Sequence, residues 1–375
     1  MNQYNLDRLK AYLSRQQIST ALLTHPHTIT WLTGYAPPVQ TGPSPFEGSP
    51  VLALWQDGQL TLIVSDMEAG AGRNAGAEEI NYLSYTIQAP IAGFANQAQA
   101  LEKALAGMGA YKGSFGLEYH WLPASLLGVI QKTLPAAAFI SLDGAFDLDR
   151  AIKSPEEVQR IRAALELADL AQEETRKLLE PGKSEIEIWG AVKARLEIQA
   201  GKRLTVLADF VAGPRTAEIG GLPGTYVLKE GDALIADIVP RLDGYWGDNA
   251  GTHFAGEPPA ELRKMYHIVL ETLQKGIQAV KPGVRACELD SLLREAIRLQ
   301  GYPAYPHHSG HGLGASYHEE PRLVPYNTLP LEPGMVVALE PGIYSPGVGG
   351  VRLEDVVLVN ESGCELLTRH LEQAG

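Results

Sequence analysis

The sequence predicts an α/β (α+β) protein with two domains, the second of which is built from two similar halves. Three observations support this prediction. The chain has 375 residues, more than a single hydrophobic core usually organises. Helical and strand patterns alternate in its first part, and stretches of its second part repeat at a spacing of roughly 100 residues.

The first domain, residues 1–145, is predicted to alternate short helices and strands. It opens with a polar, helix-patterned segment, and apolar stretches then indicate strands. Asp57-Gly58 lies between two apolar runs and predicts a hairpin turn. The predicted elements are a helix at 6–16, strands at 19–25 and 29–35, the hairpin at 51–65, a helix at 98–109, a strand at 114–119, a helix at 122–135 and a strand at 137–142.

A connector at residues 142–155 separates this domain from the second, residues 146–375. Ser154 is followed by Pro155 and, three positions on, by Glu157. This order is typical of a capping box with proline in the first helical turn. The second domain is therefore predicted to begin with a helix.

The second domain contains an internal repeat. Segments 181–201 and 282–301 both begin with Pro-Gly and align with an offset of 101 residues. Segments 228–237 and 331–340 align with an offset of 103, and each ends on an acidic residue. The alternative is a chance match between common helix-Pro-Gly sequences. We interpret the repeat as a duplicated α-α-β-hairpin unit whose halves pack around a pseudo-two-fold axis, with their acidic strands facing a shared centre.

Composition excludes several classes of function. The formal charge of −13 opposes binding to the phosphates of nucleic acids. No apolar run is long enough to span a bilayer, and the first 17 residues lack the apolar core of a signal peptide, so a cytoplasmic protein without a membrane partner is expected. Two cysteines are too few for a disulfide framework or a thiolate zinc cluster. A metal site would need Asp, Glu and His.

Two aspartates of the first half are predicted to converge. An apolar strand ends at Asp237, Asp243-Gly244 indicates a tight turn, and the returning strand carries Asp248. With a two-residue turn, residue 237 lies opposite residue 250 and diagonal to residue 248, on one face of the sheet. The two carboxylates are therefore expected to lie close together.

Two glutamates of the second half interrupt strands that should be buried. Residues 335–359 run up to Glu340, through a Gly/Pro loop, and back through Arg352 and Glu354. Four buried carboxylates cannot all ionise without compensating charge. Local bases could supply it, and Arg352 beside Glu354 is one candidate. Two divalent cations would neutralise all four acids.

Such a site favours metal-assisted hydrolysis. Oxygen ligands with one imidazole suit Mn²⁺, Co²⁺ or Zn²⁺. Paired metal ions are a common device for activating water and stabilising a tetrahedral intermediate.

Four of the ten histidines lie within HHSGHGLGASYH, residues 307–318. The glycines of this segment allow side chains to gather around His311, which we predict to be a metal ligand. His307 and His318 are predicted to hydrogen-bond the substrate and its developing oxyanion. His308 is interpreted as structural or solvent-facing.

These residues resemble those of the pita-bread-fold metallopeptidases, which include Xaa-Pro dipeptidase (prolidase) and aminopeptidase P, with creatinase as a metal-free relative. The match includes RAIKSPEEVQRIRAA at the entry to the second domain and HTITWLTGY in the first, so it covers nearly the whole chain. The five matching ligand positions, in order, are Asp237, Asp248, His311 in GHGLG, Glu340 in LEPGIY and Glu354 in GGVRLED.

The resemblance implies a creatinase-like α/β domain followed by a catalytic pita-bread domain with two divalent metal ions, for which Mn²⁺ is our first candidate. It implies that Asp248 and Glu354 bridge both ions, that Asp237 binds one, and that His311 and Glu340 bind the other. Glu340 is also implied as the proton shuttle, with His318 and His307 as catalytic and substrate-binding residues. Arg352 is our candidate for binding a substrate carboxylate or orienting Glu354, with a structural ion pair as the alternative.

The sequence departs from the family pattern at three places. Gly220 stands where prolidases and aminopeptidases P carry a substrate-facing histidine, seventeen residues before the first aspartate. Residues 248–252 read Asp-Asn-Ala-Gly-Thr in place of Asp-x-Thr-Arg-Thr, and Val239 replaces a common glycine. These changes put the usual substrate contacts in doubt, although not metal binding.

The leading functional prediction is a dinuclear metallopeptidase that cleaves Xaa-Pro bonds, as a proline dipeptidase acting on small peptides. Proline lacks an N–H and fixes φ, so its imide bond needs a dedicated pocket. The alternatives are an aminopeptidase P acting on longer peptides, a creatinase-like hydrolase of non-peptide C–N bonds, and a binding module on the same fold. The resemblance also implies a homodimer.

Overall fold

A computed structural model of the chain describes residues 1–38, 50–108 and 110–371. The chain divides into two compact units, Met1–Asp149 and Arg150–Gly375. Within the described part of the chain, no helix combines the length and the apolar character that crossing a membrane requires.

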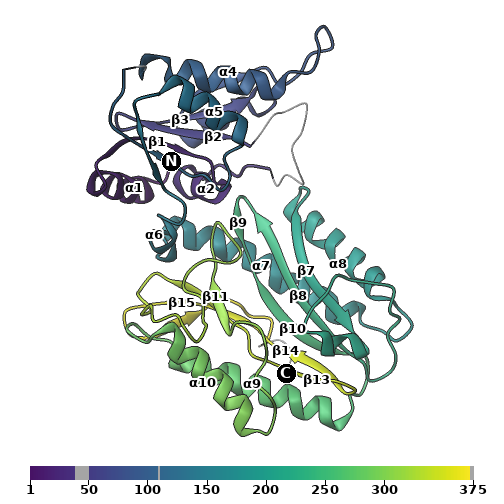
Figure 1. Cartoon of the computed structure of the whole chain (residues 1–375). Coiled ribbons are helices and arrows are strands. Elements are labelled where there is room, and N and C mark those ends of the chain that lie inside the picture. Colours follow the sequence, from purple (N-terminus) through teal and green to yellow (C-terminus); the bar gives the residue numbers. More distant parts are fainter. Residues whose placement is uncertain (39–49, 109, 372–375) are drawn as a thin grey trace. The chain divides into compact units, whose positions relative to one another are not determined.

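The first unit is a six-stranded sheet with helices on both faces (Figure 1). The strand order is β4-β3-β2-β1-β5-β6. Side chains of α1 and α2 pack in the core on one face, and those of α4 and α5 pack in the core on the other. The main elements are α1 (Gln3–Arg15), β1 (Ile18–Leu23), α2 (Pro26–Thr33), β2 (Leu52–Gln56), β3 (Gln59–Ser65), β4 (Glu78–Tyr82), α4 (Gly93–Leu105), β5 (Ser114–Leu117), α5 (Ala124–Thr133) and β6 (Ala138–Ser141).

Most of these elements were expected, but residues 29–35 are not a strand. They belong largely to helix α2, whose N-terminus is capped by the His25 side chain and begins with Pro26. Gly34 ends the helix with φ of 70°. The prediction failed because Ile29 and its β-branched neighbours favour strands locally, whereas burial of this helix in the core outweighs that preference. Residue 109, the last of the helix expected at 98–109, lies outside the described residues.

Both predicted Asp-Gly hairpin turns are confirmed. Asp57 and Gly58 have φ of 51° and 85°, and the flanking residues 56 and 59 pair. Asp243 and Gly244 have φ of 48° and 89°. The second turn sets the register in which Ala250 lies opposite Asp237, as the spacing predicts.

The second unit repeats one arrangement of helices and strands, as the sequence predicts (Figure 1). Two helices precede an antiparallel sheet in the order β10-β8-β7, with β9 paired to β8. Two more helices precede a sheet in the order β11-β12-β15-β16. The first set comprises α7 (Pro155–Leu178), α8 (Glu185–Ala200), β7 (Thr205–Ala212), β8 (Ala233–Leu242), β9 (Tyr245–Trp246) and β10 (Asn249–Phe254). The second comprises α9 (Ala260–Ala279), α10 (Ala286–Leu299), β11 (Gly310–Gly312), β12 (Val336–Leu339), β15 (Asp355–Val359) and β16 (Cys364–Leu366).

The hairpin expected at residues 335–359 is divided between two sheets. β12 pairs with β15, whereas β13 (Gly342–Ser345) pairs with β14 (Gly349–Arg352) in a separate two-stranded sheet. Pro341, which has no N–H to donate, follows Glu340 at the first break. Glu354 occupies the second break, so both glutamates lie where the ladder is interrupted.

Hydrogen bonds join the two halves of this unit next to those breaks. The Glu354 N–H donates to the Ala250 carbonyl oxygen over 2.8 Å. The Thr252 hydroxyl donates to the Arg352 carbonyl oxygen over 2.8 Å and accepts from the Arg352 N–H over 3.0 Å. These contacts bring the acidic strands of the two halves to one centre.

Candidate metal centre

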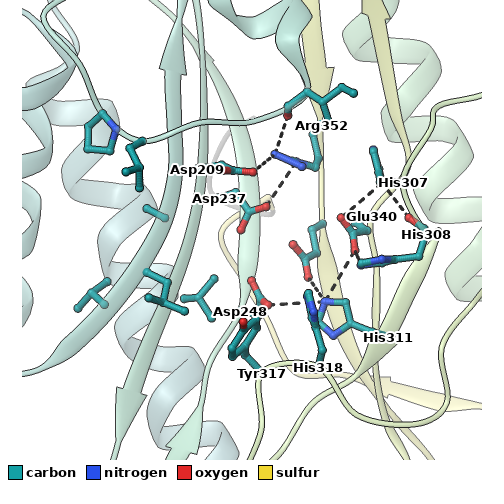
Figure 2. Close-up of a pocket in the computed structure, with 18 of the residues that line it drawn as sticks. Asp209, Asp237, Asp248, His307, His308, His311, Tyr317, His318, Glu340 and Arg352 are labelled. Atoms are coloured by element: carbon teal, nitrogen blue, oxygen red, sulfur yellow. Dashed lines mark hydrogen bonds and ion pairs between the residues drawn. The ribbon is translucent and has the colours of Figure 1, made fainter. Parts of the chain in front are cut away.

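The structure brings the five expected metal ligands together. Asp237 lies in β8, Asp248 immediately precedes β10, and His311 is the middle residue of β11. Glu340 follows β12, and Glu354 precedes β15. Their ligand atoms form two overlapping groups, Asp248/His311/Glu354 and Asp237/Glu340/Glu354, each within 4.8 Å. Figure 2 shows Asp237 and Asp248 of the first half facing His311 and Glu340 of the second.

The His311 ring is oriented for metal binding. Its Nδ1 lies 3.0 Å from the Gly312 carbonyl oxygen, so Nδ1 carries the proton and donates it there. The remaining nitrogen, Nε2, lies 3.7 Å from Asp248 Oδ2, 3.7 Å from Glu340 Oε1 and 3.9 Å from Glu354 Oε1. A neutral imidazole with a free Nε2 is the form that binds divalent metals.

Some oxygens of the buried acids have no hydrogen-bond donor in the described part of the chain, and a bound cation would fill that role. Asp248 Oδ1 and Glu354 Oε1 accept no hydrogen bond from any described residue. Burial and the neighbouring carboxylates raise the pKa of Asp248 and Glu354 well above their ordinary values. Burial likewise raises the pKa of Asp237 to about 7, although Arg352 opposes the rise. This donor set fits divalent cations, because they would satisfy the partnerless oxygens and stabilise the ionised carboxylates.

His308 was interpreted from the sequence as structural or solvent-facing, and the structure contradicts the solvent-facing alternative. Its Nε2 lies 2.8 Å from Glu340 Oε1, and its side chain is 30% exposed. With His311 and His318 it forms a third group of potential ligands. Burial alone would raise the pKa of Glu340, but the His308 hydrogen bond and the neighbouring imidazoles lower it to about 2. In the sequence, the only indication of this contact is that His308 lies in the same glycine-rich segment as His311.

The other two histidines line the same pocket. The ring nitrogens of His307 lie 2.8 Å from the His308 carbonyl oxygen and 2.8 Å from the Tyr344 hydroxyl. A direct hydrogen bond from His307 to a substrate would therefore require one of these contacts to be released. The His318 ring lies 4.3 Å from the His311 ring between centroids. Burial and the nearby imidazoles lower the pKa of His318 to about 3, so it is neutral at physiological pH.

Arg352 is held by two carboxylates of the first half. Its Nη2 donates to Asp209 Oδ2 over 3.0 Å and to the Ile219 carbonyl oxygen over 2.9 Å. Its Nε lies 3.4 Å from Asp237 Oδ2. Among the roles predicted for Arg352, the structural ion pair fits these contacts. Its partners are Asp209 and Asp237, however, and not Glu354. The contact between Asp209 and Arg352 was not predicted, because the sequence around Asp209 does not indicate which distant residues pack against its strand.

The site opens into a cavity of about 640 Å³, large enough for a small peptide. Apolar side chains line part of this cavity, and Figure 2 draws most of them as unlabelled sticks. The apolar lining residues are Trp189, Val206, Leu207, Ala208, Ile219, Leu222, Pro223 and Val239.

Two glycines that depart from the family pattern lie in crowded places. A Cβ atom on Gly220 would lie 2.0 Å from Asp209 Oδ2. A Cβ on Gly251 would lie 2.6 Å from Gln172 Oε1 and 2.8 Å from His253 Nε2. Gln172 and His253 hydrogen-bond each other over 2.8 Å. Other side chains therefore fill the space of the missing histidine and arginine.

Glu319, next to His318, is not part of the acidic centre. It forms a buried ion pair with Lys153 at 2.5 Å, and Arg150 Nε lies 3.6 Å from its other oxygen. That oxygen also accepts the Ser316 N–H over 2.9 Å. These contacts anchor the segment that carries His318.

Models of two known families match the chain. Metallopeptidase family M24 matches residues 159–361, and the creatinase/prolidase N-terminal domain matches residues 5–152. The chain is 31% identical to the putative dipeptidase YkvY of Bacillus subtilis over 368 residues, 97% of each chain. It is 36% identical to the Xaa-Pro dipeptidase of Pyrococcus furiosus over 232 residues, 62% of this chain and 67% of the relative.

Solved structures of related proteins show the same fold. The Xaa-Pro dipeptidase from Bacillus anthracis superposes with a TM-score of 0.83 at 28% identity, covering 97% of each chain. The prolidase from Pyrococcus horikoshii OT3 also gives a TM-score of 0.83, at 27% identity and 97% coverage of each chain. The two-domain α/β architecture predicted from the sequence agrees with both.

Proposed function

Because this chain belongs to metallopeptidase family M24, we propose that it is a metal-dependent Xaa-Pro dipeptidase, which releases proline from dipeptides. The observation that carries the proposal is the convergence of four carboxylates and one imidazole in the lining of a peptide-sized cavity. Relatives that are similar over most of the chain, in sequence and in structure, carry the names dipeptidase and prolidase.

We propose that two divalent ions bind the five ligands. Asp248 and Glu354 would contact both ions, Asp237 one, and His311 with Glu340 the other. Four carboxylates against two dications give a neutral centre. Bound there, the ions would polarise the scissile carbonyl group and lower the pKa of a water molecule. Mn²⁺ is our first candidate, with Co²⁺ and Zn²⁺ as alternatives.

The remaining steps fall to side chains of the chain itself. We propose that Glu340 accepts a proton from the attacking water and returns it to the proline nitrogen as the bond breaks. Neutral His318 would donate a hydrogen bond to the carbonyl oxygen as negative charge develops on it. His307 would assist only after releasing Tyr344 or the His308 carbonyl oxygen. The apolar lining of the cavity would receive the uncharged parts of the substrate.

The alternatives are less well supported. A creatinase-like hydrolase works without metals and has no use for a complete ligand set. A binding module has no need of buried acids with raised pKa values. An aminopeptidase P would share the metal centre, but it is not favoured over a dipeptidase by the relatives. Homodimer formation and a cytoplasmic location stay predictions, which light scattering of the purified protein and cell fractionation would test.

A peptide panel with metal analysis tests the proposal. Purified protein is assayed on Ala-Pro, Gly-Pro and Xaa-Pro-Xaa peptides before and after chelation, and its metal content is measured. We expect dipeptide cleavage that is lost with chelator and restored by Mn²⁺. Asp248→Asn should abolish turnover, whereas Asp243→Asn, a matched change at the exposed turn, should not. Full activity of Asp248→Asn would refute the assignment, and cleavage of tripeptides alone would refute dipeptidase activity.

A further inference from the structure

We propose that Asp209 is a specificity-determining residue: its carboxylate neutralises Arg352 and so prevents that guanidinium from binding the carboxylate of a substrate. The inference rests on the proposed dipeptidase function, because it concerns how that pocket receives a peptide with a free carboxyl end.

Asp209 is fixed at the edge of the metal centre. It lies in β7 directly opposite Asp237 in β8. One oxygen accepts the Arg352 hydrogen bond over 3.0 Å, and the other accepts the Gly221 N–H over 2.8 Å. The side chain is 38% exposed and lines the pocket. Figure 2 shows Asp209 beside Asp237, with Arg352 reaching both. A substrate in the cavity would therefore meet the Asp209 carboxylate.

Arg352 has little freedom to serve a ligand. Its side chain is only 5% exposed and lies between Asp209 and Asp237. Its Nη2 is also engaged by the Ile219 carbonyl oxygen. A guanidinium held in this way would have to break its ion pairs with Asp209 and Asp237 before it could bind another carboxylate. Its role as a substrate-carboxylate receptor, which the sequence left open, is not supported by this arrangement.

Asp209 also completes the charge balance of the site. Two bound dications would neutralise the four carboxylate ligands, which would leave the positive charge of Arg352 uncompensated. Asp209 supplies a fifth negative charge, so the five positive charges of the loaded site would be balanced by five negative ones. Without Asp209, the loaded pocket would carry one net positive charge beside the substrate. That charge would attract carboxylate-bearing ligands.

The Gly220 backbone and the Asp209 carboxylate share one small space. A Cβ on Gly220 would lie 2.0 Å from Asp209 Oδ2 and 2.5 Å from its carboxyl carbon. Asp209 in its present position therefore excludes any side chain at residue 220, including the imidazole expected there from the family resemblance. At this place in the pocket, the Asp209 carboxylate therefore stands where the family resemblance leads us to expect a histidine side chain.

Two ligands of nearly the same shape can show whether Asp209 controls specificity or has only a structural role. N-acetylproline and N-acetylprolinamide differ by one carboxylate charge. Their inhibition constants are measured against Ala-Pro hydrolysis at saturating Mn²⁺. In Asp209→Asn, the preference for the acid over the amide should rise about tenfold or more, because the Arg352 guanidinium would then be available to the ligand carboxylate. Asp243→Asn, which removes the same charge at an exposed turn, should leave the preference unchanged.

Asp209→Ser serves as a second variant in case the asparagine protein does not fold, and it should shift the preference in the same direction. An acid-to-amide preference that stays within twofold of the wild type in the folded variants would overturn the proposal. Calorimetric titration of both ligands into Mn²⁺-loaded protein gives the same ratio without turnover. If the wild type does not cleave Ala-Pro at all, the proposed function is overturned instead. Failure of the specificity proposal and failure of the proposed function are therefore distinguishable.

Discussion

Replacing Asp237 with asparagine should have opposite effects on stability in the absence and in the presence of metal. Without metal, the Asp237 carboxyl group is largely buried beside other acids, and its ionisation is unfavourable. Asparagine resembles the protonated form and removes that penalty. With metal, the same substitution removes a ligand, so the stabilisation that binding provides should fall.

The size of the first effect follows from the pKa of Asp237. Burial, with help from Glu340 and Asp209, raises this pKa from its ordinary 3.8 to about 7 against the pull of Arg352. Between these values the folded state retains a proton that the unfolded state has lost, so stability contributed by the protonated group declines as pH rises. From pH 5 to pH 8 this decline amounts to roughly 2 to 3 kcal/mol. Asp237→Asn should therefore gain that much stability relative to the wild type over this range.

Urea denaturation of chelator-treated protein at several pH values between 5 and 8 measures the difference. Taking the difference between variant and wild type cancels the titration of the buried histidines, which both proteins share. Repeating the series in saturating Mn²⁺ should reverse the ranking, and Asp243→Asn should follow the wild type throughout. The reasoning is refuted if the effect of Asp237→Asn in chelator is the same at pH 5 and pH 8.

Three further substitutions probe the surroundings of the site. Lys153→Met should cost roughly 3 kcal/mol in urea denaturation, because buried Glu319 loses a cation, and adding Glu319→Gln should recover part of the loss. Gly220→Ala should cost about 1 to 3 kcal/mol through overpacking, and Asp209→Ala in the same chain should remove most of that cost. His318→Ala should lower kcat on Ala-Pro about 100-fold, with metal content unchanged.

Matched changes elsewhere serve as controls for these three predictions. Arg162→Met breaks a partly exposed ion pair and should cost less than about 1 kcal/mol. Gly190→Ala places a Cβ in open space on helix α8 and should not destabilise. His267→Ala removes an exposed imidazole from helix α9 and should leave kcat unaltered. If a test substitution and its control change stability or kcat by the same amount, the cause assigned to the test substitution is contradicted.

The convergence of Asp237 and Asp248 could be predicted because one local signal determined it. The Asp243-Gly244 turn sets a hairpin register, and a register determines which side chains share a face. The repeat then extended the same argument to Glu340. Predictions of this kind succeed when the contact lies within one hairpin or one repeated unit.

Contacts between distant strands could not be predicted in this way. Asp209 and Arg352 are separated by 143 positions, and their pairing depends on how two sheets pack. The contact between His308 and Glu340 could not be predicted for the same reason, since Glu340 follows a different strand. The helix at Pro26–Thr33 was missed because its local propensity opposes the conformation that burial stabilises.

The hydrogen bond from Glu354 to Ala250 joins the two halves of the unit that supply the proposed ligands. The five proposed ligands extend from residue 237 to residue 354, and neither half of the unit holds them all. A nascent polypeptide that has left the ribosome only as far as the first acidic hairpin can offer two aspartates and no more. Tight loading with ions must therefore wait until translation has passed the last glutamate and the halves have docked. Metal occupancy would accordingly report that maturation is complete.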